Sequence, residues 1–122
     1  MASKSCPTFV AECFALRTAT HFAHLSSKSY AEHMALGDFY DSLTDLTDKY
    51  AEVYMGLTKQ VPFTGWPDVS LPRSSPVEML EDFLDKIEYE EAEDSEHQSL
   101  LNILAEMEEL TAQTLYKLRN LK

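Results

Sequence analysis

The feature that most constrains the fold is a long amphipathic stretch between Ser29 and Gly56. Ser29 and Glu32 form an S-x-x-E capping box, which begins helices, and glycine is typical of the position just beyond a helix end. At about 100° per residue the apolar side chains in between share one face, which we expect to be the core face. They are Leu36, Phe39, Leu43, Leu46, Tyr50, Val53, Tyr54 and Leu57. The pattern predicts a helix of about 26 residues, roughly 39 Å long, and therefore an all-α fold.

Three further segments show helical patterns. The first covers about residues 7 or 8 to 24 or 25. Another begins at Pro76, with Ser75 as its N-cap, and ends within residues 90–94. The last begins near residue 94 or 95 and carries a stripe at three- and four-residue steps, made of Leu100, Leu101, Leu104, Met107, Thr111, Leu115 and Leu118. We therefore expect four helices.

The connections between these helices differ in length. A few residues join the first helix to the second and the third to the fourth, so each pair should form an antiparallel hairpin. Residues 57–74 join the second helix to the third, and a segment of this length can return along the whole bundle. One long crossover between two hairpins is the connectivity of a ferritin-like four-helix bundle. We expect Phe63 and Trp66 to fix the crossover on a single domain, residues 1–122.

The charge of the chain excludes several functions. Asp and Glu number 21 against 10 Lys and Arg, a formal net charge of -11. Such a chain lacks the basic surface that binding to nucleic acid or to an anionic membrane requires. It also lacks an apolar run of the roughly 18 residues that a membrane span needs and a secretory signal, so we expect a cytoplasmic protein. Cys6 and Cys13 would be about 10 Å apart along a helix, too far for a disulfide, and should be free thiols.

A polar ridge runs along the predicted second helix, opposite its core face. It consists of His33, Gly37, Asp41, Asp45, Asp48 and Glu52. An outward polar face is common to amphipathic helices, so one interpretation is a solvated surface. Carboxylates four residues apart repel each other, however, which favours a compensating cation. His21 and His24, at the end of the preceding helix, bring three of the chain's four histidines into this hairpin. The other interpretation is therefore a metal site.

The distances along the helix determine which residues could share an ion. His21 and His33 flank the hairpin turn, whereas Asp48 and Glu52 lie about 22 and 28 Å further along. One chain cannot place all four around an ion, but a second copy with its helix antiparallel would bring its carboxylates beside these histidines. Imidazole with carboxylate suits iron, manganese or zinc. We therefore predict a homo-oligomer, at least a dimer, through the second helix. His24 and Asp41 are predicted auxiliary ligands.

The spacing of these residues resembles the ferroxidase pattern of the Dps mini-ferritins. In that family a second His follows the first by 12 residues, and an Asp and a Glu follow the second His by 15 and 19. The corresponding residues here are His21, His33, Asp48 and Glu52. The resemblance implies a site shared between two subunits that would oxidise Fe(II) with peroxide or oxygen. Position 37 departs from it, since the family has Asp where this chain has Gly37, and Asp41 or Asp38 would have to compensate.

A second resemblance covers about half of the chain. The run HLSSKSYAEHMAL at 24–36, followed by Tyr40 and by EVYMG at 52–56, is similar to a family of small uncharacterised tailed-phage proteins. This resemblance implies a ferritin-like bundle encoded by a phage, located in the host cytoplasm or on the virion. It does not imply an iron cage.

Two functions follow from these patterns. The first is binding of a metal, iron before zinc or manganese, with weak ferroxidase activity if the site is redox-active. The second is a phage structural or interaction module that binds no cofactor, catalyses nothing, and holds phage or host proteins. Nine acidic residues within 81–96 are expected to be a solvated face. Asp94 and His97 are spaced like a ligand pair but are expected to straddle the start of the fourth helix.

Overall fold

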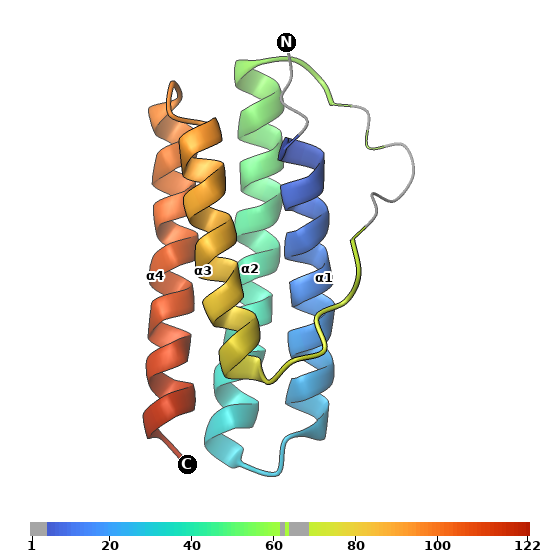
Figure 1. The fold of residues 1–122 in the computed structure, drawn as a ribbon, viewed down its shortest axis with the longest axis vertical. Coiled ribbons are helices and arrows are strands. Elements are labelled where there is room, and N and C mark those ends of the chain that lie inside the picture. Colours follow the sequence, from blue (N-terminus) through green and yellow to red (C-terminus); the bar gives the residue numbers. More distant parts are fainter. Residues whose placement is uncertain (1–4, 62, 64–68) are drawn as a thin grey trace.

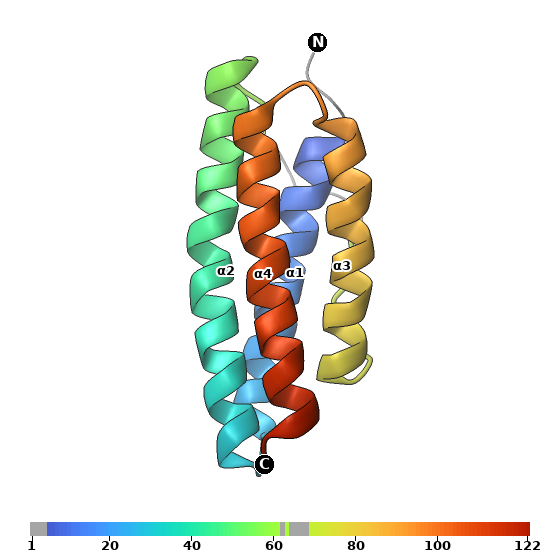
Figure 2. The same ribbon diagram turned by 90° about the vertical axis from the view of Figure 1, so that its left-hand side faces the viewer.

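The computed structural model describes residues 5–61, 63 and 69–122. These residues form four helices that lie side by side in one bundle (Figures 1 and 2). α1 (Ser5–Ser26) and α2 (Tyr30–Leu57) make one antiparallel hairpin, and α3 (Pro76–Glu93) and α4 (Gln98–Asn120) make the other. α2 and α3 each pack against both α1 and α4, so α1 and α4 are diagonally opposite. The predicted all-α four-helix bundle is therefore confirmed.

Residues 69–75, the described part of the connection that leads into α3, run beside α1, as Figure 1 shows. Because of this crossover, α2 and α3 run in the same direction. Val61 is buried at its start, whereas Phe63 is 45% exposed. The prediction that Phe63 fixes the crossover is therefore wrong, since Val61 takes the buried place. Trp66 lies outside the described residues.

α2 begins as predicted but ends later. The Ser29 side chain accepts a hydrogen bond from the Glu32 amide at 3.2 Å, which caps the first turn. At the other end Gly56 lies within the helix rather than beyond it. Thr58 is the C-cap, and both its amide and its hydroxyl donate to the Tyr54 carbonyl, at 3.0 and 2.7 Å. The Tyr54 carbonyl, one of the last carbonyls of α2, therefore accepts from two donors of Thr58, and no glycine cap is needed to end the helix.

The turn between α3 and α4 is displaced from its predicted place. α3 starts as expected, with the Ser75 side chain accepting from the Glu78 amide at 3.3 Å. Asp94 is the C-cap of α3, and His97 is the N-cap of α4. The prediction that the last helix begins at residue 94 or 95 is wrong, because the Asp94 side chain is buried in the bundle instead of capping α4.

The core lies along the axis of the bundle, where the apolar faces meet. Most of the predicted α2 core face is buried or partly buried, but Leu57, in the last turn, is 48% exposed. Aromatic rings join three helices at one level. Phe9 of α1 lies parallel to Phe83 of α3 with ring centroids 6.1 Å apart, and it meets Tyr50 of α2 edge-on at 5.2 Å. These contacts fix the positions of α1, α2 and α3 relative to one another.

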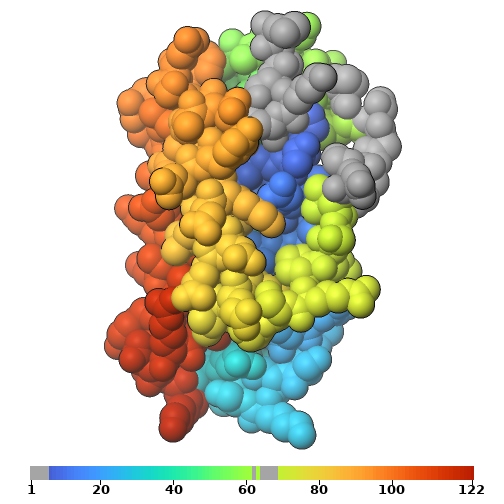
Figure 3. All heavy atoms as spheres, viewed as in Figure 1, coloured from blue at the N-terminus to red at the C-terminus, as the bar shows by residue number. Residues whose placement is uncertain are grey.

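α3 has 18 residues against 28 in α2, and it stops short of the α1–α2 turn. In the space-filling view this turn projects beyond α3 (Figure 3). Four large apolar side chains of this projecting part are exposed, and we call the surface that they form the hairpin end. They are Phe22, Leu25, Tyr30 and Met34, at 59, 67, 77 and 44%. Within the described ranges, the helices are too short or too polar to cross a membrane.

Candidate functional site

Three predicted site residues gather where α1 turns into α2. His21 and His24 lie in the last two turns of α1, and His33 lies in the first turn of α2. The His24 and His33 rings stack with centroids 3.7 Å apart and planes 18° apart. His21 stacks instead on Tyr40 at 4.3 Å, and His24 meets that ring edge-on at 5.4 Å. The hairpin therefore brings all three histidines into one partly buried cluster.

Each stacked histidine is held by the backbone of the other. His24 Nδ1 forms a hydrogen bond with the His33 carbonyl oxygen, and His33 Nδ1 lies 2.8 Å from the His24 carbonyl oxygen. A carbonyl oxygen only accepts, so each Nδ1 carries the hydrogen. The lone pair of the neutral ring is then on Nε2, which is the tautomer that metal-ligating histidines adopt when Nδ1 donates to a carbonyl. The hairpin thus fixes both the orientation and the tautomer of the two rings.

Tyr40 is a member of this cluster that the sequence patterns did not assign to the site. Its ring contacts His21 and His24, and the Arg17 guanidinium carbon lies 5.1 Å from its centre, a cation–π contact. The signal in the sequence is helical spacing on two segments. Arg17, His21 and His24 follow one another at steps of four and three, and Tyr40 follows His33 by two turns.

Gly37 faces the histidine cluster of its own chain. A Cβ atom at this position would lie 3.1 Å from His24 Cε1 and 3.2 Å from His24 Nδ1. The imidazole therefore occupies the space that a side chain at position 37 would need. The Dps pattern has an aspartate at this position, and here the His24 ring stands in its place. The alternative substitutes, Asp38 and Asp41, are exposed on the outer side of α2.

The carboxylates of the ridge lie on the open outer face of α2. Asp41, Asp48 and Glu52 are exposed. Asp48 and Glu52 line a shallow open depression of about 360 Å³, together with Asp45, Lys49 and Val53. Lys49 also reaches toward α4, where its Nζ lies 3.6 Å from Glu106 Oε1. The depression has three carboxylates, those of Asp45, Asp48 and Glu52, against one lysine, so its net charge is negative.

The fold of one chain does not bring these carboxylates to the histidines. Along a straight helix Asp48 and Glu52 are about 22 and 28 Å from His33. In the described part of the chain, no three His, Cys, Asp or Glu side chains form a group that could hold a metal ion. Among the described residues, the predicted donor set therefore does not come together within one copy and would require two.

A second polar cluster, which the sequence patterns missed, is buried between α2 and the end of α3. The Tyr50 hydroxyl lies 3.0 Å from Glu90 Oε2 and also donates toward the Asp94 carboxyl. Tyr50, Glu90 and Asp94 are 0, 1 and 2% exposed. The prediction of a solvated acidic face over 81–96 is therefore wrong for two of its nine members. The missed signal is helical spacing, since Phe83, Ile87, Glu90 and Asp94 follow one another at steps of four, three and four.

Burial changes the protonation of this second cluster. Burial raises the pKa of the Asp94 carboxyl above its usual 3.8, and hydrogen bonds with Tyr50 and Glu90 oppose the rise. Burial, with the nearby charges of Glu90 and Asp94, also raises the pKa of the Cys6 thiol to about 12. Burial likewise raises the pKa of Cys13. Both cysteines are free, as predicted, and both are fully buried, so neither has the thiolate character of a catalytic cysteine.

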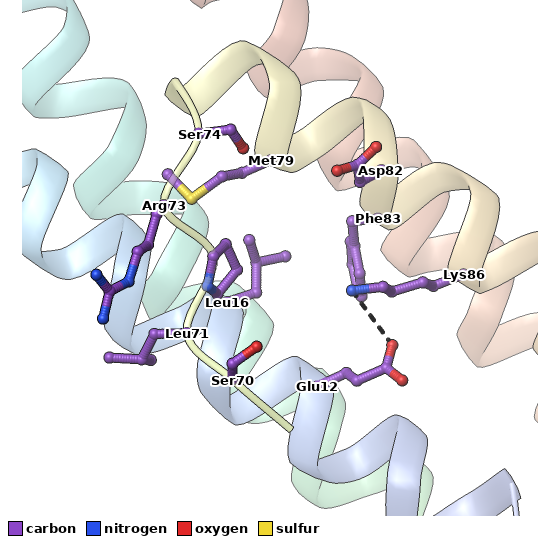
Figure 4. Close-up of a pocket in the computed structure, with 11 residues that line it drawn as sticks. Glu12, Leu16, Ser70, Leu71, Arg73, Ser74, Met79, Asp82, Phe83 and Lys86 are labelled. Atoms are coloured by element: carbon purple, nitrogen blue, oxygen red, sulfur yellow. Dashed lines mark ion pairs between the residues drawn. The ribbon is translucent and has the colours of Figure 1, made fainter. Parts of the chain in front are cut away.

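A larger pocket lies between α1 and α3, beneath residues 70–74 of the crossover (Figure 4). Its volume is about 480 Å³, and Leu16, Met79 and Phe83 contribute apolar surface to it. On one side Lys86 of α3 pairs with Glu12 of α1, with Nζ and Oε2 3.4 Å apart. The predicted ligands lie elsewhere, so this pocket is separate from the histidine cluster.

Comparison with known proteins gives a family and a phage relative. The chain matches a family of unknown function (DUF5856) over residues 24–118, a range that contains His24, His33, Asp48 and Glu52 but begins after His21. An uncharacterized 14.6 kDa protein from the mobD-ri intergenic region of Enterobacteria phage T4 is 35% identical over 66 residues.

The matched 66 residues are 54% of this chain and 52% of the T4 protein, so the two are similar over about half of each length. No solved structure matches the chain. The predicted resemblance to small uncharacterised phage proteins is thus supported by a family and by a relative. The chain belongs to the DUF5856 family of unknown function.

Proposed function

We propose that this protein binds a divalent transition-metal ion, iron(II) before zinc or manganese, between the α2 helices of two antiparallel copies. His21 and His33 of one copy and Asp48 and Glu52 of the other would be the ligands, with His24 and Asp41 auxiliary. The observation that carries the proposal is the pair of hydrogen bonds from His24 and His33 Nδ1 to backbone carbonyls. They orient both rings and leave the lone pair of each on Nε2.

The arrangement of α2 supports the involvement of a second copy. Its outer face carries His33 near one end and the exposed carboxylates of Asp48 and Glu52 near the other. An antiparallel two-fold contact places the histidine end of each helix beside the acidic end of its mate, and it forms two equivalent sites. In the absence of a cation, the neighbouring carboxylates on this face repel one another. A bound metal would remove that repulsion in both sites.

The bundle is of a kind that supports such a site. α2 and α3 run parallel and are joined by one long crossover, which is the connectivity of ferritin-like bundles. We infer a ferritin-like, phage-encoded protein that acts in the cytoplasm of an infected cell or on the virion. Ferroxidase activity should be weak. With His24 where the Dps pattern has an aspartate, the donor set has one negative charge fewer, and Fe(III) gains less Coulomb stabilisation from it than in Dps.

The first test measures metal content together with solution mass. The purified protein is loaded with Fe(II), Zn(II) or Mn(II), desalted, and analysed for metal per chain and for mass by light scattering. We expect one ion per chain in a dimer or larger oligomer. The His33→Ala variant should lose the metal. The control is His97→Ala, which alters the remaining histidine, at the α3–α4 turn, and should keep it. A wild-type protein without metal after loading contradicts the proposal.

A second test asks whether two chains share one site. His33→Ala and the double variant Asp48→Asn/Glu52→Gln should each bind no metal alone. When they are mixed and allowed to exchange subunits, half of the dimers are hybrids. Each hybrid carries one site with intact histidines and intact carboxylates, so about a quarter of the wild-type metal should return. No recovery in a mixture that demonstrably exchanges subunits contradicts a shared site.

The hairpin end favours a second candidate function, an interaction module without metal. Phe22, Leu25 and Tyr30 are each more than half exposed, and contiguous exposed apolar side chains mark contact surfaces. A phage or host protein would bind there. A metal-free monomer in the first test would favour this function. In that case Phe22→Ser/Leu25→Ser should leave the mass and the circular dichroism unchanged while weakening the partner complex.

A further inference from the structure

Arg17 is a partly buried cation whose guanidinium lies against an aromatic ring. The guanidinium carbon is 5.1 Å from the centre of the Tyr40 ring. Over residues 5–61, 63 and 69–122 Arg17 forms no ion pair, whereas Lys49, on the outer side of α2, is paired with Glu106 of α4. The fold therefore orients the guanidinium of Arg17 and leaves its donors available to an acidic group of another molecule.

Arg17 also lies at the edge of the polar ridge of α2. It precedes His24 by seven residues, about two turns, so the two side chains share one face of α1. The His24 ring fills the space beside Gly37, which is a member of the ridge. One turn further along α2, Arg17 contacts Tyr40, the residue before the exposed Asp41. This face of α1 therefore borders the ridge, with Arg17 at the level of Tyr40.

The antiparallel contact proposed above determines what faces this level in the second copy. Along antiparallel helices, a step forward on one copy corresponds to an equal step back on the other. Tyr40 lies seven residues after His33, so the facing residues lie seven before the two carboxylate ligands of the second copy. They are Asp41 and Asp45, and both are exposed. Arg17 of one copy would therefore face these two aspartates of the other.

The centre of this contact would be strongly negative without a cation. Its two-fold axis passes at about the level of Asp41, so the aspartates of both copies gather there. Carboxylates that face one another repel, and the two metal sites lie about 10 Å away along the helix, too far for their ions to bind these aspartates. The two Arg17 side chains, one from each copy, supply positive charge at the same level.

We propose that Arg17 of each copy binds the Asp41 and Asp45 carboxylates of the other, and that these two equivalent contacts hold the centre of the α2 interface. The inference rests on the proposed dimer but not on its metal, since neither Arg17 nor Asp45 is a predicted ligand. A planar guanidinium has enough donors for two carboxylates. Its contact with Tyr40 restricts the side chain before the second copy arrives, which lowers the entropy lost on binding.

Analytical ultracentrifugation with EDTA and with Zn(II) tests the pairing through the dissociation constant of the dimer. Arg17→Glu should raise this constant by more than about tenfold, because two attractive contacts in each dimer become repulsive. Arg17→Gln should have a smaller effect in the same direction, and it replaces Arg17→Glu if that variant does not fold. Arg73→Glu changes the net charge equally at an exposed arginine before α3. This control should dimerise like the wild type.

A mixing experiment shows whether the contact joins two chains. Asp41→Arg/Asp45→Arg should also dimerise poorly alone, since Arg17 then faces positive charge. Mixed with Arg17→Glu it should form hybrids, because both contacts of a hybrid join opposite charges. Mixed with Arg73→Glu, which has the same net charge as Arg17→Glu, it should not.

The outcomes separate this pairing from the proposed metal site. A dimer that depends on Arg17 but holds no metal supports the pairing and contradicts the metal site. A metal-loaded dimer that neither Arg17 variant weakens, or hybrids that form with both acidic variants or with neither, overturns the pairing alone. A wild-type protein that stays monomeric with and without Zn(II) overturns both.

Discussion

His24 and His33 hold each other across the α1–α2 turn, since each Nδ1 donates to the carbonyl oxygen of the other residue while the two rings stack. The two residues are nine positions apart, and the turn between them contains the N-cap of α2. The pair is therefore part of the structure of the hairpin, and any role as a metal ligand uses rings that the fold has already oriented.

Replacing His24 by Ala should destabilise the protein by about 1–3 kcal/mol, because one hydrogen bond and the ring stacking are lost and the His33 ring loses its partner. Urea unfolding followed by circular dichroism measures the change. Phe22→Ala is the control, because this neighbouring ring is 59% exposed and its removal should lower the stability only slightly. A His24→Ala variant as stable as the wild type would show that the pair does not hold the hairpin.

The two glycines of α2 should respond differently to alanine. A glycine in the interior of a helix destabilises the protein by about 1 kcal/mol relative to alanine. At Gly56 no atom lies within 4 Å of the added Cβ, so Gly56→Ala should stabilise the protein by a part of that amount. At Gly37 the added Cβ meets the His24 ring, which its hydrogen bond holds in place. The gain in stability from alanine should therefore be cancelled or reversed in Gly37→Ala. Paired thermal melts measure both, and an equal gain at the two sites contradicts the close contact.

Replacing Tyr50 by Phe should destabilise the bundle by about 1–3 kcal/mol, because two buried carboxyl groups lose a shared donor while the ring remains. Tyr116→Phe, at a tyrosine that is 61% exposed, is the matched control and should be nearly neutral. Denaturant unfolding at neutral pH measures both variants. Equal effects in the two would mean that the Tyr50 hydroxyl contributes no more than a surface hydroxyl.

The dependence of stability on pH should carry a contribution from Asp94 with a definite sign. Its pKa is raised in the folded protein, so the folded state favours the protonated form. The contribution is complete below the usual pKa of 3.8 and is lost as the pH rises through the folded-state value. The free energy of unfolding of Asp94→Asn, relative to the wild type, should therefore increase with pH. Taking this difference removes the general repulsion of an acidic chain, and a constant difference from pH 4 to 8 contradicts the shift.

Features that depend on local rules could be predicted from the sequence. The caps at Ser29 and Ser75 use side chains that bond amides three residues away, and the core face of α2 follows from helical spacing. The crossover was predictable because its length matches the length of a bundle that two hairpins must share. The proximity of His21 and His33 could also be predicted, because the two residues flank a short turn.

Features that depend on distant partners could not be predicted. Asp94 ends α3 rather than beginning α4 because its carboxyl meets Tyr50, 44 residues earlier in the chain. The space beside Gly37 is filled by a ring from another helix. Val61 rather than Phe63 is buried because of the path of the crossover, which no local pattern specifies. For the same reason the site formed by His33, Asp48 and Glu52 remains a prediction, since its completion depends on a second chain.

The path of the crossover also decides which helix can meet another molecule. Residues 70–74 pass over the groove between α1 and α3, where they cover Leu16 and Phe83. A chain of the same length that returned over α2 instead would have covered the acidic ridge and closed that face to any partner. Because residues 70–74 lie over α1 and α3, they leave the ridge of α2 exposed, and a change in their path would alter which face of the bundle another molecule can reach.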